Sequence, residues 1–235
     1  MDKFKLNQKK DNVIIFSDFD GTISIQDVND EIFKEFGDEY SQEIEEKLQK
    51  NLLSDKDAME KQYERLEMSK KDFESFIYNN IDIDPYFKEF YKMIKKNNID
   101  FSIISGGFIE YIVITLNKAD ISFDHPIYAS TIDFTKDNTK PNFLHDIKEC
   151  KEIFGPCGNC KNKILEEIDN KQIVYIGDGL TDRCVADMAD LLLVKSNSIL
   201  ENYCIKNNIN YKPFKNFKDV KNILNKHLKL IESRW

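Results

Sequence analysis

Three short apolar segments of the sequence each end in a cluster of small and acidic residues. The segment VIIFS is followed by DFDGT at 18–22, FSII by Ser-Gly-Gly at 105–107, and IVYI by GDGLTD at 177–182. Five of the eight glycines belong to these clusters, and glycine lets the backbone come close to a ligand. Since ligands of open α/β sheets bind at the carboxyl ends of the strands, the pattern predicts one site built from three strand ends.

The carboxylates of these clusters could bind a metal ion. Asp18 and Asp20 are two residues apart, so on an extended backbone their side chains point to the same side, and Asp178 follows a neighbouring strand. Ionised carboxylates that crowd one point repel each other unless a cation lies between them. An all-oxygen ligand set suits Mg²⁺. A helix cap or a turn would explain any single aspartate, but the combination favours a metal site.

The segments that position these clusters alternate between strand and helix patterns. Strands are expected where short apolar runs are bounded by Gly, Asp or Ser, at 13–18, 101–105, 126–131, 173–178 and 190–195. Helical spacing of apolar residues is found at 84–97, 108–118, 161–170, 181–188 and 197–207, and again in the tail at 217–231. This alternation predicts an α/β fold, a doubly wound parallel sheet with helices packed on it.

Residues 24–84 form a segment of a different kind, with no proline and with Gly37 as the only glycine. Ser54 and Ser69 each begin a capping box, which indicates the start of a helix. Apolar residues recur at helical spacing within the segment: Val28, Ile32, Phe33 and Phe36, then Ile44, Leu48 and Leu52. We expect three or four helices that form a small all-helical cap domain at 24–83, inserted into a core domain made of 1–23 and 84–235.

The bulk composition narrows the class of protein. A hydrophobic content of 41% and a charged content of 32% describe a globular chain, and no apolar run is long enough to cross a bilayer. The net charge of −8 disfavours nucleic acid as a partner, because phosphate backbones need a basic surface. The N-terminal segment is polar and lacks a signal-peptide apolar block, so we expect a cytoplasmic location. Five cysteines, an odd number, do not indicate a disulfide framework in that compartment. The oligomeric state is not predicted.

Four motifs in order resemble those of the haloacid dehalogenase superfamily. DFDGTI at 18–23 resembles motif one, DxDx(T/V); Ser105 resembles motif two, Lys161 motif three, and GDGLTD at 177–182 motif four. The resemblance covers nearly the whole chain and implies a Rossmann-like core. The helical insert between motifs one and two is similar to that of the subgroup that contains phosphoserine phosphatases.

The resemblance implies a phosphatase reaction and a role for each acidic residue. Asp18 would attack phosphorus and form an aspartyl-phosphate. Asp20 would protonate the leaving alkoxide and then activate the water that cleaves the intermediate. Mg²⁺ would be held by the Asp18 carboxylate, the Asp20 backbone carbonyl and Asp178. The presence of Asp20 favours phosphoester hydrolysis, although transfer to another acceptor than water stays open.

The same resemblance implies a set of phosphate-binding groups. The Ser105 hydroxyl, the Lys161 ammonium and backbone N–H groups near Phe19 and Gly106 would hold the non-bridging oxygens of the phosphate. Asp182 would steady the lysine or a metal-bound water. The expected partner is therefore a small phosphorylated metabolite.

Two details indicate a subgroup of this family. CGNCK at 157–161 places a Cys-rich loop before Lys161, as in the 2-hydroxy-3-keto-5-methylthiopentenyl-1-phosphate phosphatases of methionine salvage. The YIGDGLTD region is similar to that group and to phosphatases of sugar or polyol phosphates. Thr181 stands where phosphoserine phosphatases usually carry Asn, which disfavours phosphoserine. Phosphoserine phosphatase, a phosphotransferase and a non-catalytic phosphometabolite-binding protein are the alternatives.

Two further sites each have two interpretations. The resemblance implies that Asp27, which stands where many relatives with an insert carry an acidic residue, could contact a substrate hydroxyl or amine; it could also be a first-turn acid that the helix dipole favours. His145, Cys150, Cys157 and Cys160 could supply four ligands to a structural zinc ion, or the cysteines could be partly buried free thiols.

Overall fold

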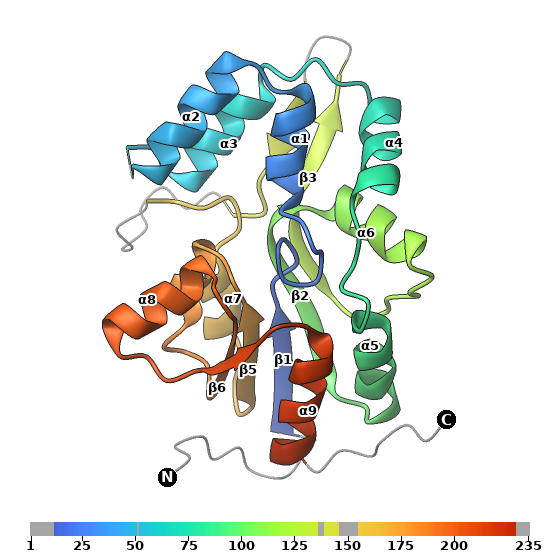
Figure 1. Cartoon of the computed structure of the whole chain (residues 1–235), viewed down its shortest axis with the longest axis vertical. Coiled ribbons are helices and arrows are strands. Elements are labelled where there is room, and N and C mark those ends of the chain that lie inside the picture. The colour runs from blue at the N-terminus through green and yellow to red at the C-terminus, as the bar shows by residue number, and fades with distance from the viewer. Residues whose placement is uncertain (1–11, 51, 136–138, 146–154, 229–235) are drawn as a thin grey trace.

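The fold is centred on one seven-stranded sheet with the order β4-β3-β2-β1-β5-β6-β7 (Figure 1). The computed structural model describes residues 12–50, 52–135, 139–145 and 155–228. All neighbouring strands are parallel except the antiparallel pair β3/β4. The strands are β1 (Val13–Ser17), β2 (Asp100–Phe108), β3 (Ile127–Phe134), β4 (Thr139–Asn142), β5 (Gln172–Gly177), β6 (Leu191–Lys195) and β7 (Lys212–Phe214). The predicted α/β doubly wound sheet is confirmed.

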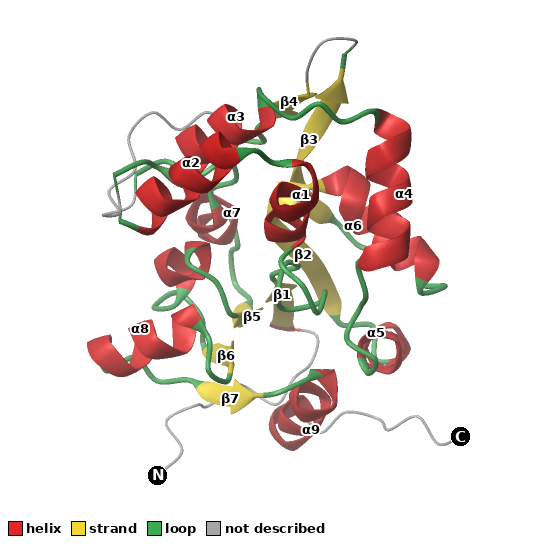
Figure 2. Ribbon diagram, turned by 45° about the horizontal axis from the view of Figure 1, so that its top comes forward, coloured by secondary structure: helices red, strands yellow, loops and turns green. Residues whose placement is uncertain are grey.

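Helices cover both faces of this sheet because the side chains of each strand alternate between the faces (Figure 2). Val13 and Ile15 of β1 belong to one buried cluster, which includes side chains of α5 (Phe87–Lys96), α6 (Ile109–Lys118) and α9 (Phe217–Leu228). Ile14 and Phe16 belong to a second cluster on the other face. This cluster includes side chains of α7 (Lys161–Glu166), the 3₁₀ helix η2 (Thr181–Val185) and α8 (Ile199–Asn207). β1 is buried on both faces and is the centre of the core.

Several elements differ from the sequence-based expectation. β4 and β7 were not predicted, because TKPN and KPF are short and each contains a proline, which is confined to the edges of sheets. Residues 181–188, expected as an α-helix, contain only the short 3₁₀ helix η2, and α7 ends at Glu166 instead of continuing to 170. In the part of the chain that the structure describes, no helix is long and apolar enough to span a bilayer.

The insert after β1 contains four helices: α1 (Val28–Phe36), α2 (Glu39–Gln49), α3 (Asp55–Tyr63) and α4 (Lys70–Asn80). Ser54 and Ser69 cap α3 and α4 through hydrogen bonds from the backbone N–H groups of Asp57 and Asp72, each 3.1 Å long, as predicted. Leu52 was expected on the buried face of a helix, but α2 ends before it and the residue is 69% exposed.

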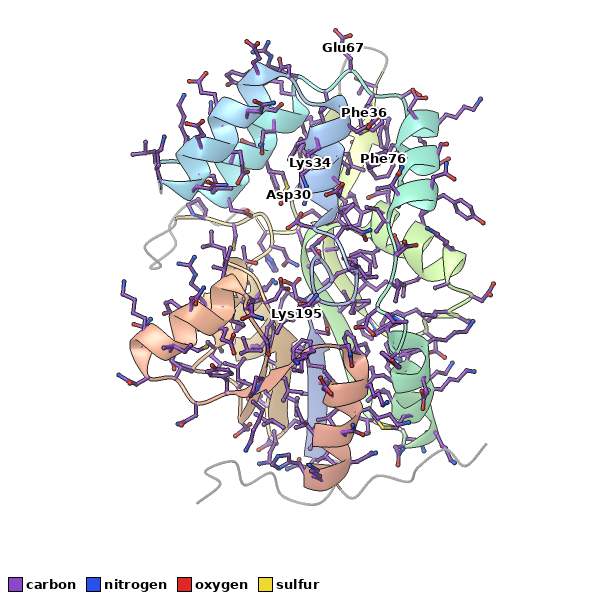
Figure 3. All side chains as sticks on the ribbon, viewed as in Figure 1. Asp30, Lys34, Phe36, Glu67, Phe76 and Lys195 are labelled. Carbon is purple, nitrogen blue, oxygen red and sulfur yellow. The ribbon has the colours of Figure 1, made fainter. Side chains whose placement is uncertain are left out.

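The helical insert packs against itself and against the β3–β4 pair. Phe36 of α1 and Phe76 of α4 meet edge to face with ring centroids 5.3 Å apart (Figure 3). Phe73 of α4 contacts Phe134 of β3 at 5.1 Å between centroids. The Thr139 hydroxyl of β4 donates to the carbonyl of Met68, between α3 and α4. The helices of the insert therefore pack against a pair of strands that comes much later in the chain.

The two segments that lead into and out of the insert run side by side. Ser24 and Ile83 form an isolated antiparallel bridge. The N–H of Ile25 donates to the carbonyl of Asp82, and the N–H of Asp84 to the carbonyl of Ile23, both at 2.9 Å. The bridge between Ser24 and Ile83 coincides with the predicted boundaries of the cap domain. The division into two domains stays a prediction.

Candidate active site

Asp18 lies directly after β1, at the sheet edge where the carboxyl ends of β1, β2 and β5 meet. Its backbone N–H donates to the carbonyl of Ile176 of β5, which fixes the position of the residue. Its Oδ1 accepts a hydrogen bond of 2.7 Å from the N–H of Phe19, and its Oδ2 lies 2.9 Å from the Nζ of Lys161. Burial, with the negative charge of Asp182 next, raises the pKa of Asp18 well above its usual value, although Lys161 opposes this. The carboxyl group is thus held in one orientation in a dry environment.

Lys161, the first residue of α7, is a fully buried cation between two carboxylates. Its Nζ lies 2.6 Å from Asp182 Oδ1 as well as 2.9 Å from Asp18 Oδ2. Burial favours the neutral amine, but the charges of Asp18 and Asp182 outweigh it and leave the pKa of Lys161 raised. The ammonium has three donors, so one proton remains for a further acceptor.

Asp182, on η2, supports the lysine and the strand-end loop. The Tyr175 hydroxyl donates to its Oδ1 at 2.5 Å, and the N–H groups of Asp178 and Gly179 donate to its Oδ2 at 2.9 and 2.8 Å. Burial opposes ionisation, but the charge of Lys161 and the hydrogen bonds from Lys161 and Tyr175 leave the pKa of Asp182 lowered. Both oxygens are occupied by protein donors, so Asp182 acts as a support for its neighbours.

The residues present fit a divalent cation. Carboxylate oxygens of Asp18, Asp178 and Asp182 lie within 4.8 Å of one another. Burial, and then the charge of Asp182, raises the pKa of Asp178 to about 6, which a bound cation would reverse. The Thr22 hydroxyl donates to Asp178 Oδ1. The Asp182 oxygens accept four hydrogen bonds from the protein, so Asp18 and Asp178, with backbone carbonyls, are the groups that would hold a metal, and this ligand set stays a prediction.

Gly21 keeps space open next to Asp178. It has a φ of +66°, and a Cβ at this position would lie 2.6 Å from Asp178 Oδ2. An L-residue would therefore be strained and would also displace the carboxylate. Lys195 of β6, labelled in Figure 3, donates to the Gly21 carbonyl and anchors the loop.

Asp20 is held by three donors from three elements. Its Oδ2 accepts hydrogen bonds from the hydroxyls of Ser105 (2.9 Å) and Tyr111 (2.7 Å), and its Oδ1 accepts one from the N–H of Val28 (3.2 Å). Burial raises the pKa of Asp20, against these hydrogen bonds. The geometry links the loop after β1 to β2, to α6 and to the first residue of α1 in the insert.

Ser105 and Gly106 belong to β2 and lie close to Asp20. The Ser105 hydroxyl donates to Asp20 and accepts from the N–H of Gly107 at 2.9 Å. A side chain at Gly106 would meet no atom within 4 Å, so space is open there. At Gly107 a Cβ would lie 1.3 Å from the Tyr111 hydroxyl, so glycine is needed for the contact between Tyr111 and Asp20.

Asn159 ties the loop before Lys161 to the sheet. Its fully buried amide nitrogen donates to the carbonyls of Ser105 (2.9 Å) and Tyr128 (2.8 Å). His145 Nδ1 lies 3.1 Å from its Oδ1. Cys157 and Cys160 form no disulfide among the described residues, and of the proposed zinc ligands Cys150 lies outside them. Among the residues that the structure describes, the only cluster of three or more potential metal-binding side chains is the Asp18 group.

Asp27 lies at the N-cap of α1. Its carboxylate accepts a hydrogen bond of 3.1 Å from the N–H of Asp30, and the residue is exposed. This is the arrangement expected for a residue that the helix N-terminus favours. The contact with a substrate group stays a prediction.

Four residues of the site were not singled out by sequence reasoning: Thr22, Tyr111, Asn159 and Tyr175. Thr22 lies inside DFDGTI and Asn159 inside CGNCK, so both could have been found from these motifs. Tyr111 and Tyr175 sit in a helix and a strand whose pattern indicates only core, and their hydroxyls reach Asp20 and Asp182 across the fold.

Comparisons with known proteins agree with this geometry. Residues 12–224 match the model of the family described as "Putative Phosphatase". A 2-hydroxy-3-keto-5-methylthiopentenyl-1-phosphate phosphatase of Bacillus cereus is 29% identical over 221 residues, with 92% of this chain and 97% of that protein covered. The corresponding protein of Bacillus mycoides is 30% identical over 213 residues, with 89% and 94% covered. A phosphoserine phosphatase structure from T. onnurineus superposes with a TM-score of 0.67 at 15% identity and covers 98% of both chains, a likeness that shows the fold.

Proposed function

Since the chain belongs to the Putative Phosphatase family and is a phosphatase with the haloacid dehalogenase fold, we propose that it hydrolyses a small phosphomonoester with Asp18 as nucleophile and Mg²⁺ as cofactor. The observation that supports this most is the buried position of Asp18. Its carboxylate is aligned by the Phe19 N–H and by the Lys161 ammonium at 2.9 Å, at the carboxyl ends of the strands, where ligands of open α/β sheets bind.

In the proposed reaction, an Asp18 oxygen forms a bond to phosphorus while the bond from phosphorus to the leaving oxygen breaks. Asp20 gives its proton to the leaving alkoxide, and in the second half of the reaction it accepts a proton from the water that attacks the aspartyl-phosphate. The raised pKa of Asp20 favours the protonated form that the first step needs. The hydrogen bonds from Ser105 and Tyr111 orient the carboxyl for both steps.

Two sets of groups would neutralise and hold the phosphate. Asp18, Asp178 and the backbone carbonyl of Asp20 would hold Mg²⁺, which would offset the repulsion between an anionic nucleophile and an anionic substrate. Lys161 has one ammonium proton free of its two carboxylate partners, and the Ser105 hydroxyl can turn from Asp20 towards a phosphate oxygen. Open space at Gly106 suits a phosphate oxygen next to the backbone of β2.

We also propose that residues 24–83 act as a cap domain over a core of 1–23 and 84–235. The side-by-side pairing of the two connecting segments at Ser24 and Ile83 supports this division, because a hinge needs both connections at one place. The hydrogen bond from Val28 to Asp20 supports a direct link between the cap and the acid/base group.

For the substrate, we propose a phosphorylated metabolite of the enol phosphate or the sugar and polyol phosphate class. This chain covers nearly the whole length of the two Bacillus relatives, which are named 2-hydroxy-3-keto-5-methylthiopentenyl-1-phosphate phosphatase. The loop with Cys157 and Cys160 before Lys161 resembles that group. The proposed compartment is the cytoplasm, where the described cysteines, which form no disulfide, would stay reduced.

The test is hydrolysis of p-nitrophenyl phosphate with and without Mg²⁺. We expect metal-dependent turnover that Asp18→Asn abolishes, while Asp187→Asn, which changes an exposed aspartate near η2, leaves it unchanged. Full activity of the Asp18→Asn variant would contradict the mechanism. Absence of turnover in the wild type would favour a non-catalytic binding protein, and alcohol-dependent product formation would identify a phosphotransferase.

A further inference from the structure

Asp55, the first residue of α3, has a buried carboxylate oxygen without a partner. Its Oδ2 is closed off from solvent and has no hydrogen-bond partner in the described part of the chain. An unpartnered buried carboxylate is costly, so it calls for an explanation such as an unfilled binding site.

The helix dipole does not explain this burial. The first turn of α3 contains a second acid, Asp57, which is exposed, as expected for a residue whose task is to interact with the N-terminus. The cap itself is Ser54, whose hydroxyl accepts from the Asp57 N–H. Asp55 is therefore redundant as a capping residue, and its Oδ2 is closed off from the water that Asp57 faces.

The first turn of α3 lies against the core segment that leads to Lys161. The N–H of Lys56 donates to the carbonyl of Pro156 at 3.2 Å, and a Cβ at Gly155 would touch the side chain of Ser54. The carboxyl of Asp55 lies within electrostatic range of Lys161 and of Asp20, since both charges act on it. Asp55 is thus on the insert, at its seam with the core, near the phosphate-binding and acid/base groups.

We propose that Asp55 is a specificity residue that accepts a hydrogen bond from a hydroxyl or ammonium group on the leaving group of the substrate. The inference rests on the proposed function and adds to it the chemical class of the leaving group. A hydrogen-bond donor that enters next to the phosphate would give Oδ2 the partner that the protein itself does not provide.

The charges of the insert agree with a donor and disfavour a carboxylate on the substrate. The only described arginine of the insert, Arg65, is paired with Asp38 at 3.0 Å and lies over the ring of Tyr40 at 4.4 Å. A substrate carboxylate that reached Asp55 would meet a like charge in place of a guanidinium. Phosphoserine is therefore expected to be a poorer substrate than a polyol or amino-alcohol phosphate.

The experiment compares kcat/KM for four phosphomonoesters in the Mg²⁺-loaded full-length enzyme. Glycerol 3-phosphate carries hydroxyl donors, phosphoethanolamine an ammonium, phosphoserine a carboxylate in addition to an amine, and propyl phosphate no donor. The variants are Asp55→Ala, Asp55→Asn and the matched control Asp57→Ala, which removes the same charge from the same helical turn. Thermal unfolding of each variant reports any structural role.

We expect the wild type to prefer a donor-bearing ester to propyl phosphate. Asp55→Ala should reduce this preference by about 10- to 100-fold, the usual loss for a hydrogen bond to a charged group, without slowing propyl phosphate turnover or lowering the melting temperature. Asp57→Ala should leave the preference as it is. Asp55→Asn should retain the kcat/KM for hydroxyl-bearing esters and lower it for the ammonium-bearing ester. The amide oxygen still accepts a hydrogen bond but no longer carries a charge.

The same preference in Asp55→Ala as in the wild type would overturn the inference, as would an equal loss for all four esters. Wild-type enzyme that turns over none of the esters would instead contradict the proposed function on which the inference rests. The two failures are therefore distinguishable.

Discussion

Replacement of Lys161 by methionine should destabilise the protein strongly. The lysine side chain is 0% exposed, and the side chains of its partners Asp18 and Asp182 are 7% and 0% exposed. Methionine fills a similar volume but removes the positive charge. Two buried carboxylates then face each other without the cation that lies between them.

The magnitude follows from the protonation state that the variant must adopt. Removal of one partner of a buried ion pair costs about 3–5 kcal/mol. The cheapest relief is for one carboxyl to bind a proton, which at about pH 7 costs about 1.36 × (7 − 3.9), or about 4 kcal/mol. The two figures agree, and the loss is a large part of the 5–15 kcal/mol that typically stabilises a domain.

Because the variant must bind a proton in the folded state, its loss of stability depends on pH. In the variant, the folded state keeps a proton on one carboxyl at a pH where the unfolded chain has lost it. The free energy of unfolding of the variant therefore falls as the pH rises above about 3.9. The deficit relative to wild type should be about 1.5 kcal/mol near pH 5 and about 4 kcal/mol near pH 7.

Urea denaturation at several pH values measures this deficit, with Lys171→Met as the control. Lys171 forms a surface ion pair with Asp100, and its loss should cost less than about 1 kcal/mol at every pH. The double variant Lys161→Met with Asp182→Asn should recover stability at pH 7 but not activity. A deficit below about 1 kcal/mol near pH 7, or one that does not shrink at lower pH, would refute the charge-balance argument.

Three further predictions concern single residues. Asn159→Ala removes the donor to two carbonyls and should lower the free energy of unfolding by about 2–4 kcal/mol in urea titrations. Burial raises the pKa of Asp55 to about 6, so its ionised form destabilises the fold near pH 7. Asp55→Asn should therefore stabilise the protein by up to about 3 kcal/mol near pH 7 and have no effect below about pH 4. Urea titrations at these two pH values test this. Gly21→Ala places a Cβ 2.6 Å from Asp178 Oδ2 and should raise the Mg²⁺ concentration for half-maximal activity at least about 10-fold. An unchanged Mg²⁺ titration would contradict the proposed metal position.

The sequence was most informative where residues close in the chain act together. DFDGT and GDGLTD are local patterns at strand ends, and parallel strands bring such ends to one edge, so the sequence alone predicts that Asp18 and Asp178 meet. The five main strands were equally predictable, because buried parallel strands are short continuous apolar runs.

What the sequence did not predict depends on contacts between distant residues. Tyr111 reaches Asp20 from a helix whose pattern indicates only core, and Thr139 joins the insert from a strand pair much later in the chain. Asp55 was not singled out from the sequence, where it is one of two acids that follow Ser54. Its missing partner is visible only when the insert is placed on the core, because burial of a single oxygen is a property of the packed structure.

The most direct test of the central claim is to trap the covalent intermediate on Asp18. Enzyme quenched during turnover and reduced with borohydride should yield a peptide in which Asp18 has become homoserine, since borohydride reduces an acyl phosphate but not a free carboxylate. We predict this conversion at Asp18, none at Asp20, and none without substrate. Conversion at another residue, or active enzyme in which Asp18 is never converted, would contradict the account.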